Sequence, residues 1–263
     1  MTRQFRYLEH DRRDGVITIT LNRPERRNVL SPEMLHELLM AFEDAGESDA
    51  LGVVLAANGS VYCAGHDFTD MLDQELERVR ELFALCSNVM QTMQSIPQPV
   101  IARVHALATG AGCQLVAAAD LAVASSDASF CTPGGKGGLF CTTPLVAVGR
   151  SIGRKRALEM GMSGDAVDAK TAEAWGLINQ VVDPDQLVGA TDDLMRRVTR
   201  GSAVSKGVGK RAFYTQMDLD QTNAYAYASE IMATASQHRD AQEGIRAFIE
   251  KRAPQWAPPS RRN

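Results

Sequence analysis

The sequence predicts an α/β fold, in which a largely parallel β-sheet is covered by helices. Short runs of small apolar residues recur along the first 185 residues, and helical patterns lie between them. Such alternation favours parallel pairing of the strands. Almost no strand pattern follows residue 188. We therefore expect one layered core unit over residues 1–195 and a helical C-terminal region over residues 196–263.

The first elements are marked by alternation and by a helix-start signal. Residues 15–22 (GVITITLN) alternate apolar and polar side chains, as a half-buried strand does. Ser31 followed by Pro32 predicts a helix start, because serine caps free N–H groups and proline here gives up an amide that has no partner. This helix should run to about residue 45, and an apolar run over 51–59 predicts a buried strand.

The remaining elements follow from the same signals. In order, we expect a short strand into a tight turn over 61–68, a helix over 71–95, a strand over 99–110, a short helix over 113–119, a strand over 121–126, a glycine-rich loop over 129–140 and a helix over 142–153. Asp168 starts and Gly176 stops a further helix, which a short strand follows. Residues 188–252 predict three helices, and residues 253–263 predict a frayed tail.

Composition and charge argue against several classes of protein. The 28 lysines and arginines against 32 aspartates and glutamates give a formal net charge of -4, which favours neither a nucleic acid nor an anionic membrane as partner. No run of about 18 apolar residues predicts a membrane span. The N-terminus lacks the apolar stretch of a secretory signal. We expect a cytoplasmic protein, or one of the mitochondrial matrix if the source is eukaryotic.

The cysteines are spaced singly along the chain. None forms the close pairs that zinc sites use, so we expect no metal site. Single cysteines in odd number suit a reducing compartment, where they are usually small buried residues. The five are Cys63, Cys86, Cys113, Cys131 and Cys141.

Two glycine-rich turns are the candidate chemical features. Residues 61–68 (VYCAGHDF) contain one of them, and residues 108–120 (ATGAGCQLVAAAD) place Gly110 and Gly112 on either side of Ala111. Glycine lets a backbone approach a ligand closely. The second turn leads into a helix, whose free N–H groups favour negative charge. The second turn alone predicts only helix packing, whereas the two together predict a binding site.

Five stretches, in this order and spacing, resemble the crotonase (enoyl-CoA hydratase/isomerase) superfamily: 19–31, 61–68, 99–133, 149–183 and 242–252. The resemblance covers nearly the whole chain. It implies a crotonase-like spiral of ββα repeats, a helical C-terminal trimerisation region, and homotrimers that often pair into hexamers. It also implies an acyl-CoA thioester as the ligand, within fatty acid metabolism, and no cofactor apart from the coenzyme A of that ligand.

The resemblance also assigns residues to a site. By motif matching, the two oxyanion-hole donors fall on the backbone N–H groups of His66 and Ala111, which would stabilise the enolate oxygen of a thioester. The positions that would contact coenzyme A or border the thioester are Arg26, Arg27, Ala64, Gly65, Asp67, Phe68, Gly110, Phe248 and Lys251. In the family, the last two commonly reach the ligand of a neighbouring subunit.

The two glutamates that deliver water in the family's hydratases are absent. Their positions hold Gln114 and Gly134, and an acid position of some isomerases holds Thr142. A positioned acid or base contributes about 10² to 10⁴ in rate, so two missing ones cost roughly 10⁴ to 10⁸ if their effects are independent. We therefore expect weak or absent hydration of enoyl-CoA, although the family is nominally one of lyases.

Other side chains near the turns offer less. Gln114 could bond a water molecule or a substrate carbonyl, or it could satisfy backbone groups beside the pocket. The His66 imidazole titrates in a useful range, but a side chain at this position is expected to point away. The thiols near the pocket lack an identifiable histidine partner. Asp67 and Asp120 are expected to cap or anchor the backbone.

Three hypotheses remain open at this point. The first is an acyl-CoA-binding family member with an oxyanion hole and little hydratase activity. The second is an acyl-CoA decarboxylase or thioester hydrolase that uses the same oxyanion hole, since loss of CO₂ generates the enolate without a base. The third is a non-catalytic protein that binds a CoA thioester.

Overall fold

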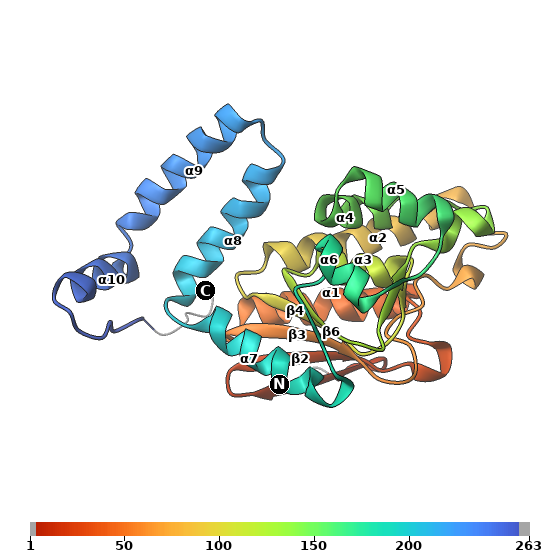
Figure 1. Ribbon diagram of the computed structural model, residues 1–263, viewed down its shortest axis with the longest axis horizontal. Coiled ribbons are helices and arrows are strands. Elements are labelled where there is room, and N and C mark those ends of the chain that lie inside the picture. Colours follow the sequence, from red (N-terminus) through yellow and green to blue (C-terminus); the bar gives the residue numbers. More distant parts are fainter. Residues whose placement is uncertain (1–3, 258–263) are drawn as a thin grey trace.

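A six-stranded sheet lies at the centre of the computed structural model, which describes residues 4–257 of the 263-residue chain (Figure 1). Its strands, in spatial order, are β1 (Leu8–Arg13), β2 (Val16–Leu21), β3 (Gly52–Ala57), β4 (Val100–Val104), β6 (Leu121–Ser125) and β9 (Gln180–Val182). β1 pairs antiparallel with β2, and every other neighbouring pair is parallel. The predicted α/β class is confirmed.

A smaller sheet gives the chain its spiral course. It consists of β5 (Ala108–Thr109), β7 (Ser129–Cys131) and β8 (Val167–Asp168). The chain passes from β4 to β5 to α3 (Ala111–Ala118), and then from β6 to β7 to α4 (Pro144–Ile152) and α5 (Arg154–Ser163). After β8, α6 (Ala169–Trp175) leads to β9. This repeated order confirms the expected ββα turns.

Helices cover both faces of the main sheet. α1 (Pro32–Glu47), α2 (Leu76–Ser95) and α3 share one core with it, whereas α7 (Leu187–Thr199) packs on the opposite face (Figure 1). The side chains of β3 alternate accordingly, with Val53 and Leu55 in the first core and Val54 in the second. Ser31 caps α1 as predicted, because its hydroxyl accepts from the Met34 N–H at 3.4 Å.

The C-terminal region extends away from this core (Figure 1). It contains α8 (Ala203–Met217), α9 (Gln221–Ser236) and α10 (Arg239–Ile249). The prediction of three helices over residues 188–252 is wrong, because α7 adds a fourth helix to this range. Between α7 and α8 the chain turns at Gly201, which has a φ of 87°. The boundary expected between residues 195 and 196 falls inside α7. The last six residues of the predicted tail lie outside the described residues.

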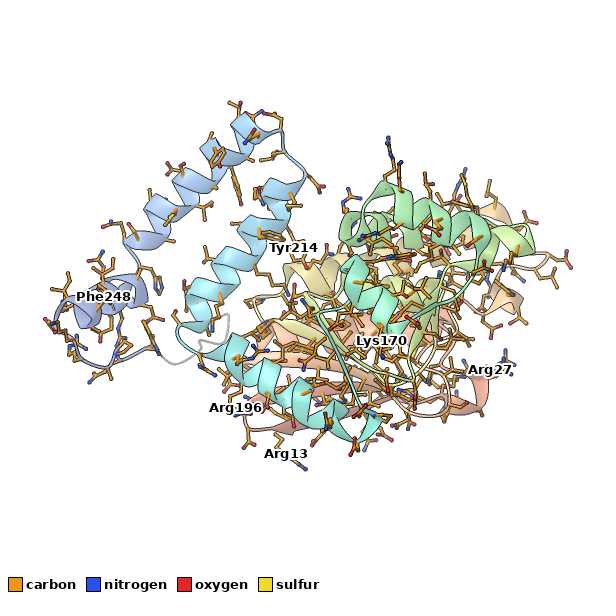
Figure 2. All side chains as sticks on the ribbon, in the orientation of Figure 1. Arg13, Arg27, Lys170, Arg196, Tyr214 and Phe248 are labelled. Carbon is orange, nitrogen blue, oxygen red and sulfur yellow. The ribbon has the colours of Figure 1, made fainter. Side chains whose placement is uncertain are left out.

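A buried ion pair anchors α8 to the core. The ammonium of Lys210 lies 2.6 Å from a carboxylate oxygen of Asp120, and their side chains are only 10% and 15% exposed. Asp120 also accepts hydrogen bonds from the Val100 N–H at 2.7 Å and from the Tyr214 hydroxyl at 2.8 Å. Figure 2 shows Tyr214 on α8. Lys210 donates further to two backbone carbonyls at and just after the end of α2. The expectation that Asp120 anchors the backbone is confirmed.

Three further details differ from the predictions. The strand predicted over 61–68 is wrong: this segment makes only isolated bridges, because it bends sharply at Gly65. The helix predicted from residue 71 begins at Leu76, after a 3₁₀ turn, η2 (Phe68–Asp70). The strand predicted over 99–110 is divided into β4 and β5, which belong to different sheets.

Among residues 4–257, no helix has both the length and the apolar character that a membrane span requires.

Candidate active site

The first glycine bend packs directly against the second. Gly65 has a φ of 82°, which glycine adopts without strain. Its carbonyl accepts from the Leu30 N–H at 2.7 Å, which ties the bend to the start of α1. A Cβ on Gly65 would lie 2.9 Å from the Thr109 carbonyl oxygen and 3.2 Å from the Ala111 nitrogen. Glycine is therefore required both by the turn and by the close approach of the two bends.

The second bend begins α3. Gly110 has a φ of 57° and a ψ of -121°, and its N–H donates to the Cys131 carbonyl at 2.9 Å. A Cβ on Gly112 would overlap the carbonyl oxygen of Cys63, so this glycine lets α3 lie against the first bend. The N–H of Ala111 is in the first turn of α3 and has no intrahelical acceptor. Within residues 4–257, neither this N–H nor that of His66 donates to a protein atom.

Both bends open onto a cavity of about 830 Å³. Ala64, Gly65 and His66 contribute to its wall from the first bend, and Gly110 and Ala111 contribute from the second. Among the described residues that line it, none is an aspartate, glutamate, lysine or arginine. Large apolar side chains form much of the remaining wall: Phe68, Met71, Leu72, Phe83, Leu139 and Phe140. The cavity therefore suits an uncharged, largely apolar group placed beside two free N–H donors.

The His66 side chain is held between a carbonyl and an aromatic ring. Its Nδ1 lies 3.3 Å from the Leu30 carbonyl oxygen, and its ring meets Phe83 edge to face at 5.2 Å. Nε2 is buried and has no hydrogen-bond partner among the described residues. Burial lowers the pKa of His66, only partly opposed by the Leu30 carbonyl, so the ring favours its neutral form.

The positions of the absent glutamates differ in their surroundings. Gln114 is buried in α3 at 4% exposure and does not line the cavity; its Oε1 has no partner among the described residues. Gly134 does line the cavity. A Cβ at residue 134 would overlap the Leu139 carbonyl oxygen and lie 2.8 Å from Cys141 Sγ. No side chain fits at residue 134 unless this loop moves.

The cysteines behave as small, unpaired residues. All five are free; Cys141 is half-buried and the other four are buried, which confirms the expectation of unpaired, largely buried thiols. Cys141 lines the cavity and its Sγ accepts from the Gly134 N–H at 3.3 Å. Burial raises the pKa of Cys141 even though this hydrogen bond lowers it, so the group remains a thiol near neutral pH.

Asp67 has a structural role beside the first bend. Its Oδ1 accepts from the Thr69 N–H at 3.1 Å, which confirms the expected cap, and its Oδ2 lies 2.5 Å from the Arg26 guanidinium. Burial raises the pKa of Asp67, but the hydrogen bonds from Thr69 and Arg26 outweigh it and leave the pKa below its usual value. Arg26 is therefore engaged, whereas the Arg27 side chain is exposed and projects from the loop before α1 (Figure 2).

Phe248 and Lys251 lie far from the cavity. Figure 2 places Phe248 on α10 and Arg27 at opposite ends of the molecule. Phe248 is 85% exposed, and Lys251 follows it in the turn that ends α10. A single chain thus brings together the two bends and Phe68, but not these C-terminal residues.

Sequence reasoning missed several wall residues. Phe83 comes from α2, and Leu139 and Phe140 come from the loop before α4. No local pattern distinguishes Phe83 from the apolar residues of α2 that face the core. The loop was identified by its glycines, and its two large apolar residues were the available signal.

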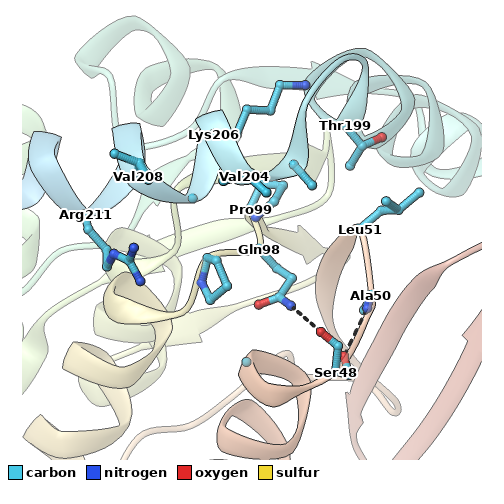
Figure 3. A pocket seen from close by; sticks show the side chains of 14 residues that line it. Ser48, Ala50, Leu51, Gln98, Pro99, Thr199, Val204, Lys206, Val208 and Arg211 are labelled. Carbon is cyan, nitrogen blue, oxygen red and sulfur yellow. Dashed lines mark hydrogen bonds between the residues drawn. The ribbon is translucent and has the colours of Figure 1, made fainter. Parts of the chain in front are cut away.

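Two other cavities lie away from the bends. One, of about 240 Å³, lies between α8 and the neighbouring part of the core. In its wall, Gln98 donates to the Ser48 carbonyl at 3.4 Å (Figure 3). The other, of about 900 Å³, lies between β2 and α7 and is lined by charges of both signs, including Asp11 and Arg103. Neither joins a glycine bend to an apolar wall, so the cavity at the bends remains the candidate site.

Comparisons with known proteins agree with this picture. A family model described as enoyl-CoA hydratase/isomerase matches residues 11–259. The mitochondrial enoyl-CoA hydratase domain-containing protein 3 of Mus musculus is 43% identical over 93% of this chain and 82% of its own length. A crystal structure described as an enoyl-CoA hydratase of Mycobacterium smegmatis has a TM-score of 0.92 at 45% identity, covering 95% of this chain and 99% of that one.

A second solved structure points to the same branch. That of human enoyl-CoA hydratase domain-containing protein 3 has a TM-score of 0.91 at 40% identity, over 95% of this chain and all of the other. Residues 112–125 (GCQLVAAADLAVAS) and 138–144 (GLFCTTP) predict likeness to this branch from the sequence, and the matches confirm it.

Proposed function

Because the chain belongs to the enoyl-CoA hydratase/isomerase family, we propose that it binds an acyl-CoA thioester whose carbonyl oxygen accepts from the N–H groups of His66 and Ala111. The observation that carries the proposal is the contact between the two glycine bends, which leaves both N–H groups free beside an uncharged cavity. The start of α3 adds the positive end of its dipole, which favours a developing oxyanion. The coenzyme A is part of the ligand, and the proposal requires no other cofactor.

The substitution Ala111→Pro tests this proposal, because it removes one N–H at the first position of a helix, where proline is tolerated. We expect the Kd for butyryl-CoA to rise about tenfold. The Kd for S-butyl-CoA, a thioether without the carbonyl, should stay unchanged. Isothermal titration calorimetry measures both constants.

Arg154→Pro is the matched control. Arg154 is also the first residue of a helix and also follows a glycine with positive φ, but it lies outside the cavity. This variant should bind both ligands as the unmodified protein does. Equal losses for thioester and thioether in Ala111→Pro would show that the N–H does not meet a carbonyl, and a protein that binds neither ligand would refute the whole proposal.

The oligomer belongs to the same proposal. The exposed apolar side chains of the C-terminal helices have no cover within the described chain; Tyr225, Met232 and Phe248 are 68%, 78% and 85% exposed. We propose that a neighbouring subunit covers them in a homotrimer, so that Phe248 and Lys251 reach the coenzyme A of that subunit while Arg27 meets its own. Light scattering should give three or six times the mass of one chain, and a monomer would contradict this arrangement.

The reaction follows from what the wall lacks. Without a carboxylate among the described wall residues, hydration should be weak or absent. Decarboxylation is a second candidate because it needs no base: the electron pair of the broken C–C bond passes to the thioester enolate, CO₂ leaves, and water protonates the α-carbon. Thioester hydrolysis and non-catalytic binding remain alternatives that a screen of malonyl-type and simple acyl-CoAs separates.

The cellular compartment is proposed from the same likeness. The vertebrate relatives are named as mitochondrial proteins. We place this chain in a compartment that holds acyl-CoA, which is the mitochondrial matrix in a eukaryotic cell and the cytoplasm in a bacterial one.

A further inference from the structure

The cavity between the main sheet and α7 is a polar groove, which we call the α7 groove. It measures about 900 Å³ and lies away from the glycine bends. Ile101 on this face of the sheet packs against α7, whereas Thr18 and Thr20 line the groove. Arg13 from β1 and Arg196 from α7 also line it (Figure 2). Its wall therefore differs in kind from the apolar wall at the bends.

Arg103 is an unexpected residue in the floor of the α7 groove. It belongs to β4, an inner strand between β3 and β6, and the other four residues of β4 are apolar and buried. Arg103 and Ile101 are two residues apart, so their side chains leave the same face of the sheet, and Arg103 lines the groove. An inner strand that is otherwise apolar thus carries a half-buried guanidinium.

The Arg103 guanidinium has no acceptor within the described chain. Among residues 4–257 it makes neither a hydrogen bond nor an ion pair. Burial lowers the pKa of Arg103, and the attraction of Asp192 opposes this only in part. Because arginine stays charged, its N–H donors remain beside the groove, partly removed from water. Such donors are stabilised by an anionic group such as a carboxylate.

Acidic side chains line the same groove. Asp192 belongs to α7 and is close enough to attract Arg103 without forming a direct ion pair with it. Asp11 contributes a second acid from β1. Neither acid has a hydrogen-bond or ion-pair partner in the described part of the chain. A simple anion would be repelled by Asp192 and a simple cation by Arg103, so the groove suits a ligand that carries both charges.

We infer that the α7 groove is a second binding site, which takes a small zwitterion of the amino-acid type. The carboxylate of the ligand accepts from the Arg103 guanidinium, whose planar fork of N–H groups matches a carboxylate, and the ammonium group of the ligand lies beside Asp192. The proposal does not rest on the acyl-CoA function, because the groove shares no lining residue with the cavity at the bends.

Three probes built on a four-carbon chain test the inference. 4-Aminobutyrate carries both charges, butyrate carries only the carboxylate, and butylamine carries only the ammonium group. We expect 4-aminobutyrate to bind saturably, with a Kd at least about tenfold lower than that of either other probe, because each of these lacks one charge-assisted contact. Ligand-observed NMR at constant ionic strength measures the three constants.

Two results with the unmodified protein would overturn the inference. One is the absence of saturable 4-aminobutyrate binding in the millimolar range, including the case in which a second copy of this chain covers the groove. The other is equal binding of 4-aminobutyrate and butyrate, which would show that the ammonium group has no partner.

Two substitutions assign the charges to residues. Arg103→Leu should abolish binding of 4-aminobutyrate. Asp192→Asn should raise the Kd of 4-aminobutyrate at least about fivefold and lower the Kd of butyrate, because it removes both the partner of the ammonium group and the repulsion of the carboxylate. A purely structural role of Asp192 would not shift the two constants in opposite directions.

Arg197→Leu is the matched control. Arg197 is an exposed arginine of α7 that does not line the groove, so this variant should bind 4-aminobutyrate as the unmodified protein does. Circular dichroism shows whether each variant is folded. If folded Arg103→Leu still binds 4-aminobutyrate, the ligand lies elsewhere and the inference fails.

The outcomes also separate this site from the proposed function. Arg103→Leu should bind butyryl-CoA as the unmodified protein does, because Arg103 does not line the cavity at the bends. If butyryl-CoA binds and 4-aminobutyrate does not, the acyl-CoA function stands and the second site is refuted. If only 4-aminobutyrate binds, the second site stands and the acyl-CoA function fails.

Discussion

Replacing Asp120 by alanine is expected to lower the free energy of unfolding by about 3 to 5 kcal/mol, the range for removing one partner of a buried ion pair. The substitution leaves the Lys210 ammonium buried with no carboxylate beside it. It also removes the acceptor of the Val100 N–H and of the Tyr214 hydroxyl. Urea unfolding followed by circular dichroism, for variant and unmodified protein at the same pH, gives the difference.

Two companion variants show whether burial is the cause. Asp218→Ala removes an exposed carboxylate that pairs with Arg150, and it should have little measurable effect. Asp120→Leu combined with Lys210→Met removes both buried charges, and it should destabilise less than Asp120→Ala because no lone charge remains. If Asp120→Ala costs no more than Asp218→Ala, the pair does not anchor α8 in the way its geometry suggests.

The elements with local signals could be predicted from the sequence. The sequence of β3 is an apolar run, which predicts a buried strand. The helix α6 begins after Asp168, which accepts from the Thr171 N–H at 2.7 Å, and it ends at Gly176, which has a φ of 90°. β1 was missed, because its sequence LEHDRR is mostly charged and mostly exposed and shows no apolar alternation. The available signal was the turn Asp14-Gly15, where φ is 51° and 78°.

The candidate site could be predicted only in part. The motifs identify both glycine bends, and the structure places them at one cavity. Ion-pair partners that depend on tertiary contacts could not be predicted from the sequence. Arg26, which was expected at coenzyme A, also pairs with Asp67. The separation of Phe248 from the bends depends on the direction that α8 takes on leaving the core, for which the sequence has no local signal.

The structure adds information about residue 134 that the sequence does not contain. From the sequence, it is only the position where a glutamate is missing. In the structure, the loop around it is closed, because a Cβ at residue 134 would overlap the Leu139 carbonyl and crowd Cys141. The substitution Gly134→Glu would therefore have to rebuild the loop before it could supply an acid.

Hydration of crotonyl-CoA is expected to be at least about 10⁴-fold slower than in a family hydratase that retains both carboxylates, measured side by side under the same conditions. Two positioned acid–base groups together contribute roughly 10⁴ to 10⁸, and the described cavity wall offers no carboxylate in their place. Burial lowers the pKa of His66, and its Nε2 is buried without a hydrogen-bond partner among the described residues. The Cys141 thiol has a raised pKa.

The loss should be specific to chemistry and not to binding. The two N–H groups act without a carboxylate, so crotonyl-CoA should still bind, with a Kd close to that of butyryl-CoA. Gln114→Glu alone should not restore hydration, because that side chain is buried away from the cavity and residue 134 cannot supply the second acid. Rapid hydration by the unmodified protein would mean that a group outside the described wall, such as one from a neighbouring subunit, completes the site.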